Sequence, residues 1–294
     1  MAPFVASLNS RTEERGSDLK YGSDIEFFLE YGGAPAPAGL ILPFQGMLGT
    51  DNHGNARGMR DTAEIRTRAS ADITDIVRDI TRALNVLWEH LALTPSKKIR
   101  TIPLLFLTGH FHHGRSIGGH VHFSSLWFNQ ENVLASQRLL SSWAIPFMHQ
   151  YDSPEQIIQR TRAGYFTSGD AVRIKSEQMG VENFHWEYRQ WGSFLISPLY
   201  CYTVLALSKL IVMNVLRAST KEEIAALPQG DKFTPESPAK MHDNLLGFKH
   251  WTPDLRYLPQ AILELESTRE EMKERWSADF MELWRDDVPL PTES

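Results

Sequence analysis

The segment SDIEFFLE (residues 23–30) mixes acidic and bulky apolar side chains at alternate positions. Alternation of this kind is typical of a β-strand, so Asp24 and Glu26 should lie on one face and Ile25 and Phe27 on the other. Carboxylates embedded among bulky apolar residues are rarely left fully solvated. The segment therefore predicts a strand with one core face and one face whose acidic groups need partners.

Four later segments repeat this two-residue period. They are DTAEIRTR (61–68), GGHVHFS (118–124), AVRIK (171–175) and FHWEYRQW (184–191). In chain order, the ionisable side chains that each segment brings to one face are Glu64 and Arg66; His120 and His122; Arg173 and Lys175; and His185, Glu187 and Arg189. If the strands are neighbours, carboxylates and imidazoles meet guanidinium groups. Divalent cations would satisfy the carboxylates, and polyphosphate would satisfy the arginines.

Helical patterns alternate with these strands. Apolar spacing predicts helices over residues 73–91 and 132–149. Ser197 before a proline is a typical helix start, and it opens an apolar segment (198–216) whose one charge is Lys209. That segment is almost long enough to span a bilayer, but its polar groups would be costly in lipid. We therefore expect a buried core helix, an α+β fold and no membrane partner.

Composition limits the class of protein. The 294 residues carry a formal net charge of −6, which argues against non-specific nucleic-acid binding. The one cysteine, Cys201, lies in the apolar segment, so we expect no disulfides and a reducing cytoplasm. The N-terminus lacks the pattern of a signal peptide. The expected organisation is an N-terminal extension (1–20), one main domain (21–218) and a helical extension (219–294) packed on it. Within that extension, residues 255–284 predict an exposed C-terminal helix.

The alternating segments resemble those of a known enzyme superfamily. SDIEFFLE resembles the glutamine synthetase segment in which two metal-binding carboxylates precede Phe-Phe-Leu, and GGHVHFSSL resembles its Gly-His-Val-His segment. AVRIK and HWEYR resemble its later pair of strands. With GTDNHGN (49–55) leading into AEIR, the chain is similar over residues 21–210 to the phage-type COOH–NH2 ligase (amidoligase) family of the glutamine synthetase and glutamate-cysteine ligase superfamily.

This resemblance implies a glutamine synthetase-like catalytic domain and a set of site residues. The implied metal ligands are Asp24, Glu26, Glu64, His120 and Glu187. The implied groups for ATP phosphates are His122, Arg173, Lys175 and Arg189, with Arg189 and Arg66 as catalytic residues and Arg66 facing a substrate carboxylate. The implied cofactors are ATP and Mg2+ or Mn2+. The sequence departs from the family's pattern at two positions. Ile25 stands where the family often has proline, and the match of Asp51 to a superfamily carboxylate stays open.

The implied reaction activates a carboxylate as an acyl phosphate and joins it to an amine, in the host cytoplasm if the protein is phage-encoded. The acid, small-molecule or peptide, and the amine stay open, and a homo-oligomer is compatible with the sequence. One alternative is a zinc-dependent hydrolase that uses His120 and His122. It leaves the arginines without a role. Others are a non-catalytic structural protein on a ligase scaffold, and phosphotransfer to a guanidino or amino group.

Overall fold

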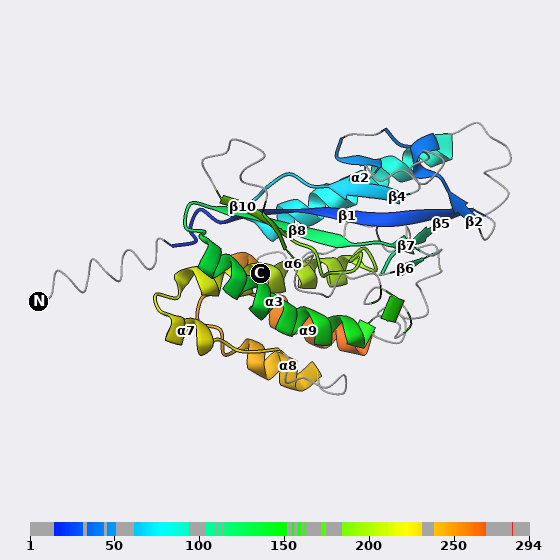
Figure 1. Cartoon of the computed structure of the whole chain (residues 1–294). Helices are drawn as coiled ribbons and strands as arrows, with labels where there is room; N and C mark the ends of the chain where they lie inside the picture. The colour runs from blue at the N-terminus through cyan, green and yellow to red at the C-terminus, as the bar shows by residue number, and fades with distance from the viewer. Residues whose placement is uncertain are drawn as a thin grey trace, which may run out of the picture.

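The computed structural model describes residues 15–31, 34–43, 46–50, 62–93, 104–109, 111–112, 115–151, 155, 158–159, 162, 172–174, 184–230, 238–268 and 284. Within these ranges a sheet crosses the upper part of the view in Figure 1, most of the helices form a layer below it, and the helix of residues 73–93 lies at the level of the sheet. The predicted α+β class is confirmed.

In the described part of the chain the main sheet has eight strands, and their pairings are antiparallel. The order is β3–β4–β1–β8–β10–β9, and β2 and β5 pair with one end of β1. The bounds are β1 Lys20–Tyr31, β2 Ala34–Ala36, β3 Leu48–Thr50, β4 Thr62–Arg66, β5 Leu104–Leu107, β8 Gly119–Ser125, β9 Val172–Ile174 and β10 Phe184–Tyr188. β6 (Phe111–His112) and β7 (Arg115–Ser116) form a separate hairpin.

The long strand β1 is central to the sheet. Its residues 24–28 pair with β4 on one side, and its residues 20–25 pair with β8 on the other. β10 follows β8, and β9 follows β10. The five alternating segments thus contain strands of one sheet, and segments far apart in the sequence become neighbours.

Helices cover the apolar face of this sheet. Their bounds are α2 Ile73–Leu93, α3 Gln130–Tyr151, α6 Pro198–Arg217, α7 Lys221–Ala225, α8 Pro238–Leu245 and α9 Leu258–Ser267, with short 3-10 helices at Ala38–Leu40 and Pro253–Leu255. Ile25 and Phe27 of β1 are fully buried in one apolar cluster with Val121 of β8 and Trp186 of β10, together with residues of α2, α3 and α6. Burial of this face stabilises the fold by ~25 cal/mol per Å² of apolar surface.

Helix α6 lies within the core. It begins as predicted, since Ser197 Oγ accepts a hydrogen bond from the Tyr200 amide at 3.1 Å. By length and composition it could cross a membrane, yet 94% of its apolar window is buried inside the protein. Lys209 Nζ donates to Asp254 Oδ2 and to the Ala71 carbonyl, each at 2.7 Å. The prediction of an almost wholly buried helix is confirmed.

The C-terminal segment shares this core. α8 contacts α9, and α9 packs on α6. Ala261, Ile262 and Leu265 of α9 are fully buried, so the helix that we expected to be exposed has a core face. Trp284 is buried too and donates to the Leu195 carbonyl at 3.2 Å. Residues 269–283 of the same expected helix lie outside the described ranges.

Candidate active site

The ionisable residues of the strands share one face of the sheet, opposite the helices. Across the sheet the strand register pairs Glu26 with Glu64, Asp24 with His120, and His122 with Glu187. The register also pairs Glu187 with Arg173 of β9. The two-residue alternation therefore brings the backbone positions of the predicted metal ligands to one face.

Glu187 is the most deeply buried acid of this face, with 2% of its surface exposed. Its Oε1 lies 3.2 Å from Nδ1 of His120 and 3.3 Å from Nε of Arg189. A carboxylate buried this far is tolerated because cationic and N–H groups offset its lost hydration. Glu187 therefore links β10 to β8 and holds Arg189 at the edge of the face.

Glu64 pairs with Arg66, which lies one pleat further along β4. Arg66 also donates to the backbone carbonyl of Thr50 at 2.9 Å and to that of Gly46 at 3.4 Å. The guanidinium thus ties the β3 region to β4. A role for Arg66 toward a substrate carboxylate stays a prediction, because both terminal nitrogens contact protein groups in this conformation.

Glu26 is held by a backbone amide that the side-chain pattern does not reveal. Its Oε2 accepts a hydrogen bond from the Gly118 amide at 2.7 Å, just before β8 begins. Two residues further along β1, Phe28 forms a small buried apolar cluster with Leu107 and Ile117. This cluster borders the ionisable face at the end beyond Glu26.

A third histidine joins the face beside the predicted pair. Nε2 of His122 lies 2.9 Å from Oδ2 of Asp24, and Nδ1 of His122 lies 3.2 Å from Nε2 of His185. The sequence pattern places His185 on this face, because it lies two residues before Glu187, but we assigned it no role. The register of β10 with β8, which the sequence does not specify, is what brings it next to His122.

The residue types of this face fit a hard divalent cation, which prefers carboxylate oxygens. Their strands are adjacent, so the backbone places the five predicted ligands within reach of a shared region. In the present side-chain conformations the acids contact neighbouring protein groups instead. No three His, Cys, Asp or Glu side chains of the described residues converge closely enough to hold an ion. A cation would bind only after side chains such as Asp24 and Glu26 turn away from their protein partners.

The side chains of three residues of interest lie outside the described part of the structure. The backbone of Arg173 lies in β9, next to Glu187 in the register, but its side chain is outside the described residues. Lys175 and Asp51 lie outside the described ranges altogether. Their roles stay predictions.

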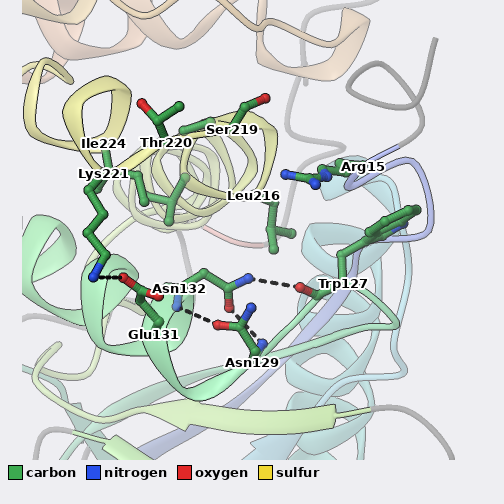
Figure 2. A pocket seen from close by; sticks show the side chains of 12 residues that line it. Arg15, Trp127, Asn129, Glu131, Asn132, Leu216, Ser219, Thr220, Lys221 and Ile224 are labelled. Atoms are coloured by element: carbon green, nitrogen blue, oxygen red, sulfur yellow. Dashed lines mark hydrogen bonds and ion pairs between the residues drawn. The ribbon is translucent and has the colours of Figure 1, made fainter. Parts of the chain in front are cut away.

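Two cavities among the described residues lie elsewhere, near the C-terminal end of α6. Figure 2 shows the smaller, of about 350 Å³, in which Lys221 pairs with Glu131 at 2.9 Å and Asn132 donates to the Trp127 carbonyl at 2.8 Å. The other, of about 450 Å³, is lined by residues that include Arg217. Neither cavity contains a predicted site residue. The described residues that the sequence predicts for chemistry lie on the ionisable face instead.

The motifs and their sheet agree with a described protein family. The model of the family described as "Phage phiEco32-like COOH.NH2 ligase-type 2" matches residues 21–276. The chain belongs to this family. The predicted resemblance is confirmed, and the match continues past residue 210, where the motifs ended, and past the expected boundary at 218. The chain is thus a member of a family described as carboxylate–amine (COOH.NH2) ligases. No curated protein sequence matches it.

Solved structures of ligases are similar in fold. PafA, in its complex with the prokaryotic ubiquitin-like protein Pup, matches with a TM-score of 0.56 at 10% identity, over 92% of this chain and 66% of PafA. A bifunctional glutathione synthetase from Pasteurella multocida has a TM-score of 0.46 at 11% identity, over 95% of this chain and 54% of that one. A glutamine synthase homologue has a TM-score of 0.45 at 13% identity, over 94% and 72%. At such identities the likeness to PafA shows the fold alone.

Proposed function

We propose that the chain is an ATP- and Mg2+-dependent carboxylate–amine ligase that acts through an acyl phosphate. One observation carries the proposal: the register of adjacent strands gathers four carboxylates, the His120–His122 pair and Arg189 on one sheet face. Family membership supports the reaction class. The gathered groups are of the kinds that phosphoryl transfer needs, since that reaction depends on positioning and on charge stabilisation.

The basic residues of the face would bind ATP. Arg189, held by Glu187, and Arg173 from β9 would take the phosphate oxygens, because a guanidinium fork matches two oxygens at once. His122 would donate an N–H to the same phosphates. The acids with His120 would hold Mg2+ or Mn2+, which supplies neutralisation of charge at the β- and γ-phosphate oxygens.

The reaction then needs two displacements. An oxygen of the substrate carboxylate bonds to the γ-phosphorus as the bond to the β–γ bridging oxygen breaks, and ADP leaves. The nitrogen of the amine then bonds to the acyl carbon, and phosphate leaves with the former carboxylate oxygen. The amine loses a proton, and an amide remains. Arg189 would bind the phosphoryl oxygens in both steps.

The test is a screen of carboxylic acids with hydroxylamine as the amine, in the presence of ATP and Mg2+. We expect at least one acid to give hydroxamate, ADP and free phosphate in equal amounts, and Glu187→Gln to abolish all three. A phosphorylated acceptor without free phosphate would indicate phosphotransfer instead. Zinc-dependent hydrolysis that ignores ATP would indicate the hydrolase.

A further inference from the structure

His185 contacts the histidine that we assign to ATP phosphate. It lies on β10, partly buried, and its ring centroid is 5.3 Å from that of His122 on β8. His122 is directly opposite Glu187 in the register, so His185 is its diagonal neighbour on the same face. Diagonal positions are within reach of long or aromatic side chains. The contact therefore follows from the register itself.

The two nitrogens of His122 have different partners. Nε2 faces Asp24 of β1 at 2.9 Å, and Nδ1 faces Nε2 of His185 at 3.2 Å. Since β8 lies between β1 and β10, the three side chains form a diagonal chain across three strands. The opposite edges of one imidazole ring point to the two partners, so the three groups do not converge on a single point. This geometry suits a relay of hydrogen bonds better than a metal site.

For an ionised Asp24 and a neutral His122, the contacts assign the protons. An ionised Asp24 can only accept, so Nε2 of His122 carries the proton that it donates. Nδ1 of a neutral His122 is then an acceptor, and Nε2 of His185 must donate to it. The hydrogen bond to one ring nitrogen decides which proton the other nitrogen carries.

We propose that His185 is a positioning residue that holds His122 with its Nε2–H directed to the ATP site. The idea rests on the proposed function, in which Asp24 turns to the cation and frees that N–H for a phosphate oxygen. His185 keeps its bond to Nδ1 throughout, so the ring does not rotate. Without it, His122 would lose both its orientation and the preference for a proton on Nε2.

Ring nitrogen spectra of the full-length protein test this directly, whether or not a substrate is known. Proton–nitrogen correlations of histidine-labelled protein, at one fixed pH, report which nitrogen of His122 is protonated, and His122→Gln assigns its signals. We expect His122 to be protonated at Nε2 in the wild type and in His185→Gln, whose amide nitrogen takes the place of Nε2. In an Asp24→Ala background, where the acceptor of the Nε2 proton is gone, adding His185→Leu or His185→Asn, whose side chains offer no donor there, should move the His122 signals to a mixture of tautomers.

Kinetics supply the second readout. The Leu and Asn variants should raise KM for ATP by up to about tenfold, on the scale of one lost hydrogen bond, with a smaller change in kcat. His185→Gln should recover the wild-type KM, and His242→Gln on α8 should match the wild type in every measurement. Unchanged His122 signals when His185→Leu or His185→Asn is added to Asp24→Ala would overturn the inference. A shift in those signals in a protein without ligase activity would sustain the positioning role and refute the proposed function.

Discussion

Arg189 owes its place to a buried carboxylate rather than to the strand alone. It follows β10, and the pair with Glu187 at 3.3 Å holds its guanidinium, whose side chain is 15% exposed, at the face. Asp24 and Glu26 likewise depend on specific partners, His122 and the Gly118 amide. At the scale of single residues, the groups on the ionisable face are thus oriented by specific contacts, some from the same strand and some from a neighbouring strand.

A conservative change at Arg189 tests the need for a guanidinium. Arg189→Lys keeps the charge but loses the planar fork. We expect kcat with a verified acid to fall ~10³-fold, the scale known for arginines that stabilise phosphoryl transfer. Arg68→Lys is the matched control, because that arginine binds Asp79 away from the site. Equal losses in the two variants would remove Arg189 from the mechanism.

Acid stability should depend on Asp79, which is 3% exposed. Hydrogen bonds from Arg68 hold the pKa of this carboxyl below its ordinary value, more than offsetting the opposing effect of burial. Because the folded pKa lies below the unfolded one of ~3.9, the stabilisation is complete above that pH and is lost as the pH falls through the folded pKa. Urea unfolding of Asp79→Asn should therefore show a deficit at pH 6 that shrinks toward pH 3. Asp75→Asn, an exposed neighbour, should show little deficit at either pH.

The sequence predicts which side chains share a face, because strand alternation is a local property. It does not predict which groups pair, since that depends on register between distant strands. Asp24 lies opposite His120 but bonds to His122, and Glu187 lies opposite His122 but contacts His120. These diagonal contacts, and the contact of His185 with His122, become visible only once the strands are aligned in space.

Helix α6 and strand β8 are the elements on which the site rests. α6 fills the core under the sheet, and β8 carries both histidines between β1 and β10. The start of α6 was predictable because its N-cap is a local signal. The core face of α9 was missed because its apolar side is defined by contact with α6 rather than by its own charged sequence. Local signals thus predicted the start and the burial of α6, which is apolar all round, but not the burial of α9.

Thiol labelling tests the burial of α6. Cys201 is fully buried, and burial raises the pKa of its thiol. We expect no reaction with a thiol reagent in the native protein and one equivalent of labelling in concentrated urea. Rapid labelling under native conditions would show that this helix is not packed beneath the sheet.

Substitution of Gly119 in β8 tests how closely the strand packs behind its histidines. A Cβ at Gly119 would lie 2.3 Å from ring carbons of Phe194 and 2.5 Å from the Gly192 carbonyl oxygen. Overpacking of this kind costs about 1–3 kcal/mol of unfolding free energy, so Gly119→Ala should be clearly destabilised. Gly22→Ala in β1, where the nearest atoms are 3.4 Å away, should lose less than about 1 kcal/mol. Similar losses would mean that β8 does not approach this segment closely.

The main sheet is built from strands that are far apart in the chain. β1 and β10, about 160 residues apart, lie on either side of β8. The predicted sheet and its ionisable face are confirmed, but the strand order was beyond the sequence because no local pattern specifies it. The tail was expected to pack on the main domain, but the contact of α9 with α6 was beyond the sequence for the same reason. In Figure 1 its helices lie under the sheet with α6.

Ligands that bind this face should stabilise the whole fold. At 100 times its dissociation constant a ligand adds ~2.7 kcal/mol, which for a chain of this size is a rise in Tm of about 5 °C. We expect such a rise with Mg2+ and ATP together, and its loss in Glu187→Gln. An equal rise with zinc alone, independent of ATP, would instead favour the hydrolase.

Transfer of a labelled oxygen tests the central claim most directly. With an acid from the hydroxamate screen carrying ¹⁸O in its carboxylate, the released phosphate is analysed by mass spectrometry. An acyl phosphate requires one carboxylate oxygen to leave with each phosphate, so the account predicts one ¹⁸O in phosphate for each amide formed. Amide formation with unlabelled phosphate, or with the label in AMP, would contradict it.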